Sequence, residues 1–380
     1  MELTGGPLVA VLVLLFLGAP AALLLLWSRV PGPAVLRVAQ RVGLVLFCQL
    51  SAVLLAAVIV NDQFELYASW SDLTGGANSA AAAAGVTHAA GGAGSATQVR
   101  SEGGPVGRGT QVMSEEFTGP RSGVHARVWI VLPPGYTAAA NSTHRYPLIE
   151  FLPGYPGVPN TWLHAMHLAD QIDQLVSGGA VRPFVAVLPV MTVEPPLDTE
   201  CTNVPHGPAV ATWLARDVPD VVSHQLRIRP AAQGWGVTGY STGGFCATKL
   251  ALQYPQVFHA AASLSGYYIP FADASTGGLF RNNPRLRRVN SPMWLVANGH
   301  QPAVDILAVS SPQDPSSWPA TRAFVAAVRP PVSLDTLVLP GGGHNTGVWT
   351  AVLPQTLGWL LHHVDRPAPR PSVLAQRRAP

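Results

Sequence analysis

Two long runs without a charged residue stand in the first 60 positions of this 380-residue chain. They cover residues 7–26 and 42–60. A helix rises 1.5 Å per residue, so about 20 apolar residues cross the ~30 Å hydrocarbon core of a bilayer. A cleaved signal peptide is the alternative for the first run, but no basic segment precedes it and the run is long for that role. We therefore expect a transmembrane hairpin over residues 1–65.

The charges around these runs indicate an orientation. Arg29, Arg37 and Arg41 lie between the runs, whereas Asp62 and Glu65 follow the second one. Arginine-bearing connections usually remain in the cytoplasm. Both ends of the hairpin then face outward, and the remainder of the chain is predicted to be extracytoplasmic.

Composition agrees with attachment to a membrane or a cell envelope. Only 11% of the residues are charged, compared with about 25% in soluble domains. The net charge of +3 is too small to indicate a nucleic-acid surface, and we expect no nucleic-acid partner. Residues 66–111 are mostly Ala, Gly, Ser and Thr and are predicted to be a flexible linker, and residues 366–380 a Pro- and Arg-rich tail.

From residue 112 to 365, short apolar runs alternate with segments of helical spacing. Continuous apolar strands alternating with helices are typical of an α/β fold whose largely parallel sheet is covered on both faces. The expected strands are 126–132, 147–152, 184–190, 234–238, 258–265, 304–310 and 335–340, and the expected helices lie near 162–177, 208–225, 243–254, 316–328 and 349–364.

The stretch GYSTGG, residues 239–244, lies between an expected strand and an expected helix. This is the context that the nucleophile motif G-x-S-x-G requires, with Ser241 as the nucleophile. Gly239 and Gly243 fit because a Cβ there would crowd the neighbouring strand and helix. An ordinary serine in a glycine-rich turn is the alternative, since the chain has 37 glycines.

A serine nucleophile needs a base and an acid that orients the base. His344 follows the last expected strand and precedes the last helix, which is the place of the base in the order Ser…Asp…His. His300 is its main competitor. Asp314 follows strand 304–310 and is the favoured acid, because ligands bind beyond the carboxyl ends of strands. Asp305 begins the same strand and remains an alternative.

Two other histidines, His362 and His363, are interpreted as solvated residues of the terminal helix. No Cys or Glu stands near the candidate metal face of His164 and His167, so we expect no metal ion and no cofactor.

An oxyanion hole needs two backbone N–H donors. One is expected from Thr242, which follows the nucleophile, and the other from Tyr155 in the loop after strand 147–152. Gly154 would shape that loop. If the body of the protein lies outside the cytoplasm, Cys201 and Cys246 can form a disulfide.

The segments RVWIVLPPGY, LIEFLPGYPG, GYSTGGFCATKLALQYPQVFHAAASLSGYY and GGGHN together resemble the esterase D and antigen 85 mycolyltransferase group of α/β-hydrolases. The resemblance covers about residues 112–364. It implies Ser241 as nucleophile, His344 as base, and Thr242 and Tyr155 as oxyanion donors. The mycolyltransferases carry their histidine in a motif like GTHSW, which this sequence lacks, so the esterases fit better.

The expected function is therefore that of a membrane-anchored, extracytoplasmic serine esterase that forms an acyl-enzyme. Its expected substrate is an acyl ester, and a lipid or a cell-envelope glycolipid is one candidate. One alternative is an acyltransferase that moves an acyl group onto an envelope sugar. The second alternative is a non-catalytic scaffold that has kept the fold.

Overall fold

The computed structural model describes residues 6–27, 29, 31–64, 100–102, 109–231 and 234–364. The chain divides into two compact units, residues 1–87 and 88–380. The predicted tail and most of the predicted linker lie outside the described residues.

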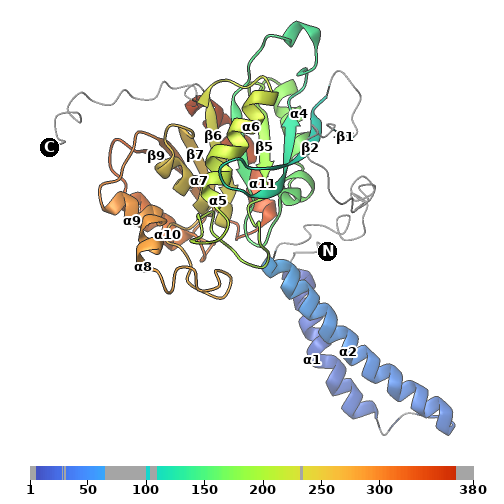
Figure 1. The fold of residues 1–380 in the computed structure, drawn as a ribbon. Coiled ribbons are helices and arrows are strands. Elements are labelled where there is room, and N and C mark those ends of the chain that lie inside the picture. The colour runs from blue at the N-terminus through green and yellow to red at the C-terminus, as the bar shows by residue number, and fades with distance from the viewer. Residues whose placement is uncertain are drawn as a thin grey trace. The chain divides into compact units, whose positions relative to one another are not determined.

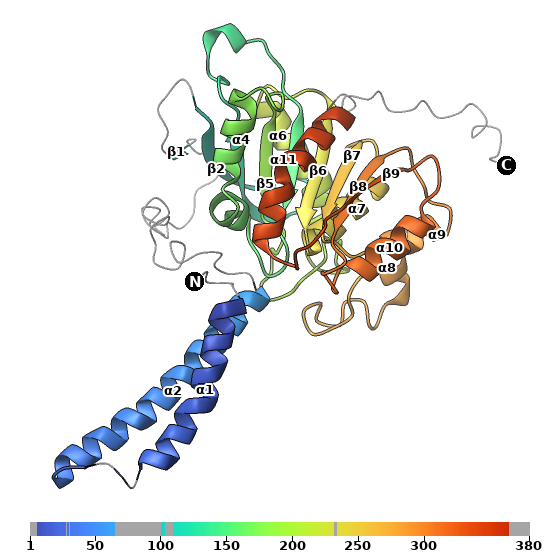
Figure 2. The ribbon, with the colours of Figure 1, turned by 180° about the vertical axis from the view of Figure 1, so that it is seen from behind.

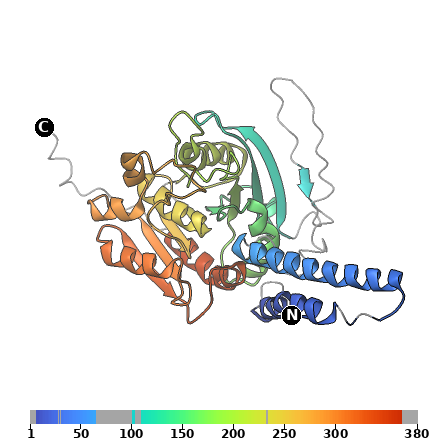
Figure 3. The ribbon, with the colours of Figure 1, turned by 90° about the horizontal axis from the view of Figure 1, so that it is seen from below.

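The first unit contains two helices, α1 (Gly6–Leu26) and α2 (Ala34–Phe64), which lie side by side (Figures 1 and 3). Both contain stretches long and apolar enough to cross a membrane. Helix α2 begins eight residues before the predicted start at 42, so Arg37 and Arg41 lie in the helix rather than in the connection. The prediction followed the uncharged run, but arginine is a good helix former and Pro33 suits the beginning of a helix.

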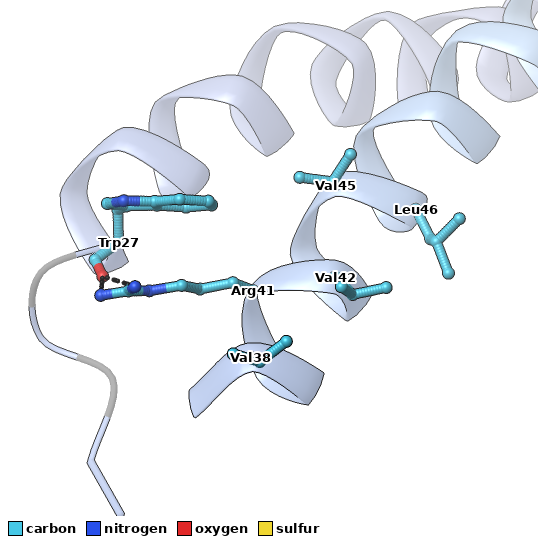
Figure 4. Close-up of a pocket in the computed structure, with 6 residues that line it drawn as sticks. All are labelled: Trp27, Val38, Arg41, Val42, Val45 and Leu46. Atoms are coloured by element: carbon cyan, nitrogen blue, oxygen red, sulfur yellow. Dashed lines mark hydrogen bonds between the residues drawn. The ribbon is translucent and has the colours of Figure 1, made fainter. Parts of the chain in front are cut away.

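Arg41 links the two helices near their connection (Figure 4). Its Nε and Nη2 donate to the backbone oxygen of Trp27 at 3.2 and 3.0 Å, and its guanidinium carbon lies 4.9 Å from the centre of the indole. Carbonyl groups at the end of a helix lack intrahelical donors, and Arg41 satisfies one of them. The pocket beside this contact is also lined by Val38, Val42, Val45 and Leu46.

In the second unit, the described strands form one sheet with the order β1-β2-β3-β5-β4-β6-β7-β8-β9. Strands β1, β2, β3 and β5 pair antiparallel, and the pairs from β5 through β4 to β9 are parallel. The bounds are β1 Arg100–Glu102, β2 Gln111–Thr118, β3 His125–Leu132, β4 Leu148–Leu152, β5 Val185–Pro189, β6 Trp235–Tyr240, β7 Ala260–Leu264, β8 Asp305–Ser310 and β9 Ser333–Val338.

Helices cover both faces of this sheet, as predicted. Helices α4 and α11 lie on the face seen in Figure 2, and α5, α6 and α7 lie on the other. Each face has its own apolar core, one built around Trp213 and Phe245 and the other around Trp162 and Leu353. The helix bounds are α4 Leu168–Ser177, α5 Val210–Thr212, α6 Val218–Gln225, α7 Thr242–Gln253, α8 Pro284–Val289, α9 Pro292–Ala297, α10 Trp318–Ala327 and α11 Thr346–His363.

Several elements were not predicted. Strand β2 carries polar residues and has no buried side, so its apolar signal is weak. Strand β1 lies within the predicted linker and pairs with β2, whose outer edge offers free backbone groups. Helices α8 and α9 are only six residues each, too short for a periodic pattern.

Glu150 occupies the middle of the central strand β4, beside Val187 and Val237 of the flanking strands. It is fully buried, and neither carboxyl oxygen has a hydrogen-bond partner among the described residues. Burial disfavours the charged form and raises the pKa of this carboxyl well above its ordinary value. The protein therefore holds a polar group in its core that destabilises the fold.

We predict that Glu150→Met stabilises the protein. A raised folded-state pKa means that stability falls as pH rises from the unfolded pKa of about 4.3 toward the folded one. The gain in melting temperature should therefore be larger at pH 8 than at pH 4.5. Removing an unsatisfied buried polar group should raise the free energy of unfolding by about 1–3 kcal/mol, which corresponds to a rise of several degrees in melting temperature. A lower melting temperature for the variant at pH 8 would contradict this prediction, which thermal denaturation followed by circular dichroism measures.

Candidate active site

Ser241 lies on a strained turn between β6 and α7. Its φ of 54° is in the left-handed region, which residues with a side chain rarely adopt. A Cβ on Gly243 would lie 2.2 Å from the carbonyl oxygen of Leu152, and one on Gly239 would lie 2.4 Å from the backbone of Gly243. Only glycine permits this close packing of helix against strand. The serine side chain is thereby presented beyond the carboxyl end of the sheet.

His344 and Asp314 come from two other strand ends and meet at this turn. His344 Nε2 lies 2.9 Å from Ser241 Oγ, and His344 Nδ1 lies 3.0 Å from Asp314 Oδ2. With the proton of the neutral imidazole on Nδ1, His344 donates to Asp314 and accepts from the serine hydroxyl. This geometry allows the histidine to remove the proton of Ser241.

Asp314 is held as a carboxylate. Its Oδ1 accepts from the backbone N–H groups of Ser316 and Ser317, and its Oδ2 accepts from the Ser317 hydroxyl at 2.6 Å. Burial by itself raises the pKa of Asp314, but the hydrogen bonds from His344 and Ser317 outweigh that effect and lower it to about 2. The group is therefore ionised throughout the neutral range and can stabilise an imidazolium.

The competing candidates lie elsewhere. Asp305 is the first residue of β8, so it lies at the amino-terminal end of the strand, away from Ser241. It accepts a hydrogen bond from His363 Nδ1 at 2.9 Å. His300 donates from Nε2 to the backbone oxygen of Leu252. His363 is buried against Trp359, so interpreting it as solvated was wrong. The cause is that Asp305, from a strand 58 positions away, supplies a polar partner that the helical pattern could not reveal.

The loop after β4 passes directly over the turn. A Cβ on Gly154 would lie 3.1 Å from Ser241 Cβ and 2.8 Å from the Tyr240 ring. Tyr155 follows at once, and its hydroxyl donates to the backbone oxygen of Pro196 at 2.5 Å. Tyr155 therefore follows a residue that packs against Ser241, and Thr242 comes directly after Ser241 as the first residue of α7. Helix N-termini present free N–H groups and favour negative charge.

Packed aromatic rings connect the residue before Ser241 with the ring of His344. Tyr240 stacks on Trp349 with centroids 4.3 Å apart and also contacts Trp162. Trp349 in turn meets the His344 ring edge-on at 5.1 Å. Trp162 and Trp349 are both buried and belong to the core.

A disulfide joins Cys201 to Cys246. Cys201 lies in the loop that follows β5, and Cys246 lies in α7, five residues after Ser241. The bond therefore attaches this loop to the helix that presents Ser241.

Sequence reasoning missed a buried polar cluster beside that bond. Lys249, the only lysine in the chain, donates to the carbonyl oxygens of Glu200 and Cys201 at 2.6 and 3.0 Å. Burial raises the pKa of Glu200 to about 8, with a contribution from Asp198, and lowers that of Lys249 to about 7. The placement of a single lysine inside an apolar helix pattern was the available signal.

Among the described residues, no group of three or more His, Cys, Asp or Glu side chains is arranged so that it could hold a metal ion. The chemical groups at the carboxyl edge of the sheet are instead a hydroxyl, an imidazole and a carboxylate in series. A nucleophile turn of this form on a mostly parallel, doubly covered sheet defines an α/β-hydrolase, and the catalytic unit is that of a serine hydrolase.

The family follows from comparison with known proteins. The profile described as "Putative esterase" matches residues 120–359, and the chain belongs to that family. An uncharacterised protein of Corynebacterium glutamicum is 24% identical over 255 residues, which are 63% of this chain and 58% of the relative. The chain thus spans little more than half the length of that relative.

Solved structures share the fold. A ferulic acid esterase superposes with a TM-score of 0.58 at 19% identity, covering 68% of this chain and 99% of its own. An S-formylglutathione hydrolase of Agrobacterium tumefaciens superposes with a TM-score of 0.58 at 14% sequence identity, and the match covers 70% of this chain and 100% of that one. A fluorophosphonate-binding serine hydrolase of Staphylococcus aureus superposes with a TM-score of 0.54 at 16% identity, and the match covers 67% of this chain and 99% of that one. The expected resemblance to the esterase group is confirmed at the level of the family and the fold.

The two aspartates of β8 and its following loop offer a matched pair of variants. We predict that Asp314→Asn lowers kcat for ester hydrolysis by about 10⁴-fold, because the amide cannot hold the imidazole in the required tautomer. Asp305→Asn should leave kcat within about threefold of the wild type, since Asp305 lies at the far edge of the sheet. Steady-state kinetics on a chromogenic ester distinguishes them, and equal losses in both variants would contradict the assignment.

Proposed function

We propose that this protein is a serine esterase that acts through Ser241, His344 and Asp314, with the backbone N–H groups of Thr242 and Tyr155 as the oxyanion hole. The observation that carries the proposal is the continuous hydrogen-bonded series from Ser241 Oγ through His344 to Asp314. Membership in the esterase family supports the reaction class.

In this mechanism, Ser241 Oγ attacks the ester carbonyl carbon while its proton passes to His344 Nε2. The two N–H groups stabilise the oxyanion, and Asp314 stabilises the imidazolium. The carbon–oxygen bond then breaks, and the alcohol leaves with the proton from His344. Water then attacks the carbonyl carbon of the acyl-enzyme while its proton passes to His344. The bond to Ser241 Oγ breaks, the serine regains a proton from His344, and the carboxylic acid is released.

The decisive variant is Ser241→Ala. It should reduce hydrolysis of p-nitrophenyl acetate and butyrate to the background rate, because the acyl-enzyme cannot form. The same change should abolish labelling by a fluorophosphonate probe, whereas Ser142→Ala, at an exposed serine, should keep the label. Wild-type activity in Ser241→Ala, or a label that persists, would refute the proposed nucleophile. A folded wild type that neither hydrolyses the esters nor takes the label would instead support a non-catalytic scaffold.

We further propose that α1 and α2 anchor the catalytic unit to a membrane, outside the cytoplasm. The support is the length and apolar character of both helices, together with Arg29 in the connection and Arg37 and Arg41 near the start of α2. An enzyme so placed would meet ester substrates of the envelope, including lipids and glycolipids.

This topology predicts the outcome of a reporter fusion. Alkaline phosphatase, which is active only outside the cytoplasm, should be active when fused after residue 70 and inactive when fused at residue 31, between the helices. Green fluorescent protein should give the reverse pattern. An active phosphatase at residue 31 would overturn the orientation, and release of the mature protein from the membrane would indicate a cleaved signal sequence.

A further inference from the structure

Behind the oxyanion hole lies a tyrosine hydroxyl that the mechanism above does not use. Tyr267 follows β7 and is buried, and its hydroxyl oxygen lies 3.2 Å from Thr242 Oγ1. The same hydroxyl donates to Glu200 Oε1 at 2.7 Å. Thr242 is the residue whose backbone N–H is proposed to bind the oxyanion, so this contact reaches the site from behind.

The Tyr267 hydroxyl is held in place by its surroundings. Its ring lies between Phe245, at 4.8 Å, and Phe271, at 4.1 Å. The acceptor Glu200 Oε1 also takes a hydrogen bond from the backbone N–H of Phe271. Neither partner of the Tyr267–Glu200 bond can rotate freely, because both are enclosed in the core.

Glu200 itself is fixed to α7. Its backbone has a φ of 44°, and that of Cys201 has a φ of 51°, so two successive residues are left-handed. Such conformations persist only when the surroundings impose them. Here the disulfide to Cys246 and the bonds from Lys249 to the carbonyl oxygens of Glu200 and Cys201 do so.

The Tyr267 hydroxyl has one proton, which it gives to Glu200, so the Thr242 hydroxyl is the donor in the 3.2 Å contact with Tyr267. Asp198, also buried, accepts from the backbone N–H of Glu200 at 2.7 Å and helps to fix the loop that holds Tyr267. The side chain of Thr242 is therefore held through Tyr267. The peptide group that joins it to the strained Ser241 has correspondingly little freedom.

We propose that Tyr267, held by Glu200, is a positioning residue that fixes Thr242 and thereby directs the Thr242 N–H toward the oxyanion. This inference rests on the proposed function, since it assigns a support to the proposed oxyanion hole. Tyr267 touches no reacting atom. It acts through the Thr242 hydroxyl, and its effect is confined to the stage at which negative charge develops on the substrate oxygen.

The test uses Tyr267→Phe, which keeps both ring contacts and removes only the hydroxyl. Removing an oxyanion donor outright costs about 10²–10³-fold in kcat, so a misdirected donor should cost about tenfold, with KM within twofold of the wild type. The affinity for phenylboronic acid, which forms a tetrahedral adduct with the serine, should fall by the same factor. The matched control is Tyr268→Phe, which removes a neighbouring buried hydroxyl in a separate core packed on Phe324.

A double-mutant cycle with Thr242→Val tests the route of the effect. If Tyr267 acts through the Thr242 hydroxyl, the double variant is no slower than Thr242→Val alone. Losses that multiply would overturn the proposal, and so would a change confined to KM, an unaltered boronate affinity, or an equal loss in Tyr268→Phe. A tenfold loss with an unchanged melting temperature supports it. Failure of the proposed function is recognised separately, because Ser241→Ala would then retain the activity of the wild type.

Discussion

The close approach of α7 to the end of β4 is the constraint on which the site depends. Gly243 lies so near the carbonyl oxygen of Leu152 that no side chain fits between them. Because the helix begins this close to the strand, the chain must turn sharply at Ser241, and the residue takes a left-handed conformation. The same contact brings the loop after β4, with Gly154 and Tyr155, over the serine. A single packing contact thus places both Ser241 and the loop proposed to supply an oxyanion donor.

The rest of the site follows from the parallel part of the sheet. Strands β4, β6, β8 and β9 run in the same direction, so the loops that follow them meet at one edge. His344 and Asp314 come from loops of different length, and separate contacts fix each. Ser317 holds the carboxylate, and Trp349 meets the imidazole edge-on. The histidine is therefore oriented before any substrate arrives.

The sequence was sufficient for the elements that repeat a simple pattern. The buried strands β4 to β8 are continuous apolar runs, and all seven expected strands appear within a few residues of their predicted bounds. The motif around Ser241 and the order of strands led to His344 and Asp314, which the structure brings together. Long-range contacts could not be predicted in this way. The hydrogen bond between Tyr267 and Glu200 joins residues 67 positions apart, and no local sequence pattern relates them. The half-exposed strand β2 and the charged start of α2 were missed because both depart from the apolar runs on which the prediction relied.

The buried lysine attaches the loop after β5 to the helix that begins directly after Ser241. Lys249 projects from α7, and its ammonium group meets the carbonyl oxygens of Glu200 and Cys201, the Thr202 hydroxyl and the Asn290 amide oxygen. An arginine would bring a planar group that stays charged, whereas lysine can share or lose its proton when buried. Asp198 and Glu200 are the acidic groups beside Lys249. Burial raises the pKa of Glu200 and lowers that of Lys249, and both shifts reduce the charge that this cluster carries in the core. Helix α7, which begins directly after Ser241, thus also holds Glu200, the residue that fixes the Tyr267 hydroxyl.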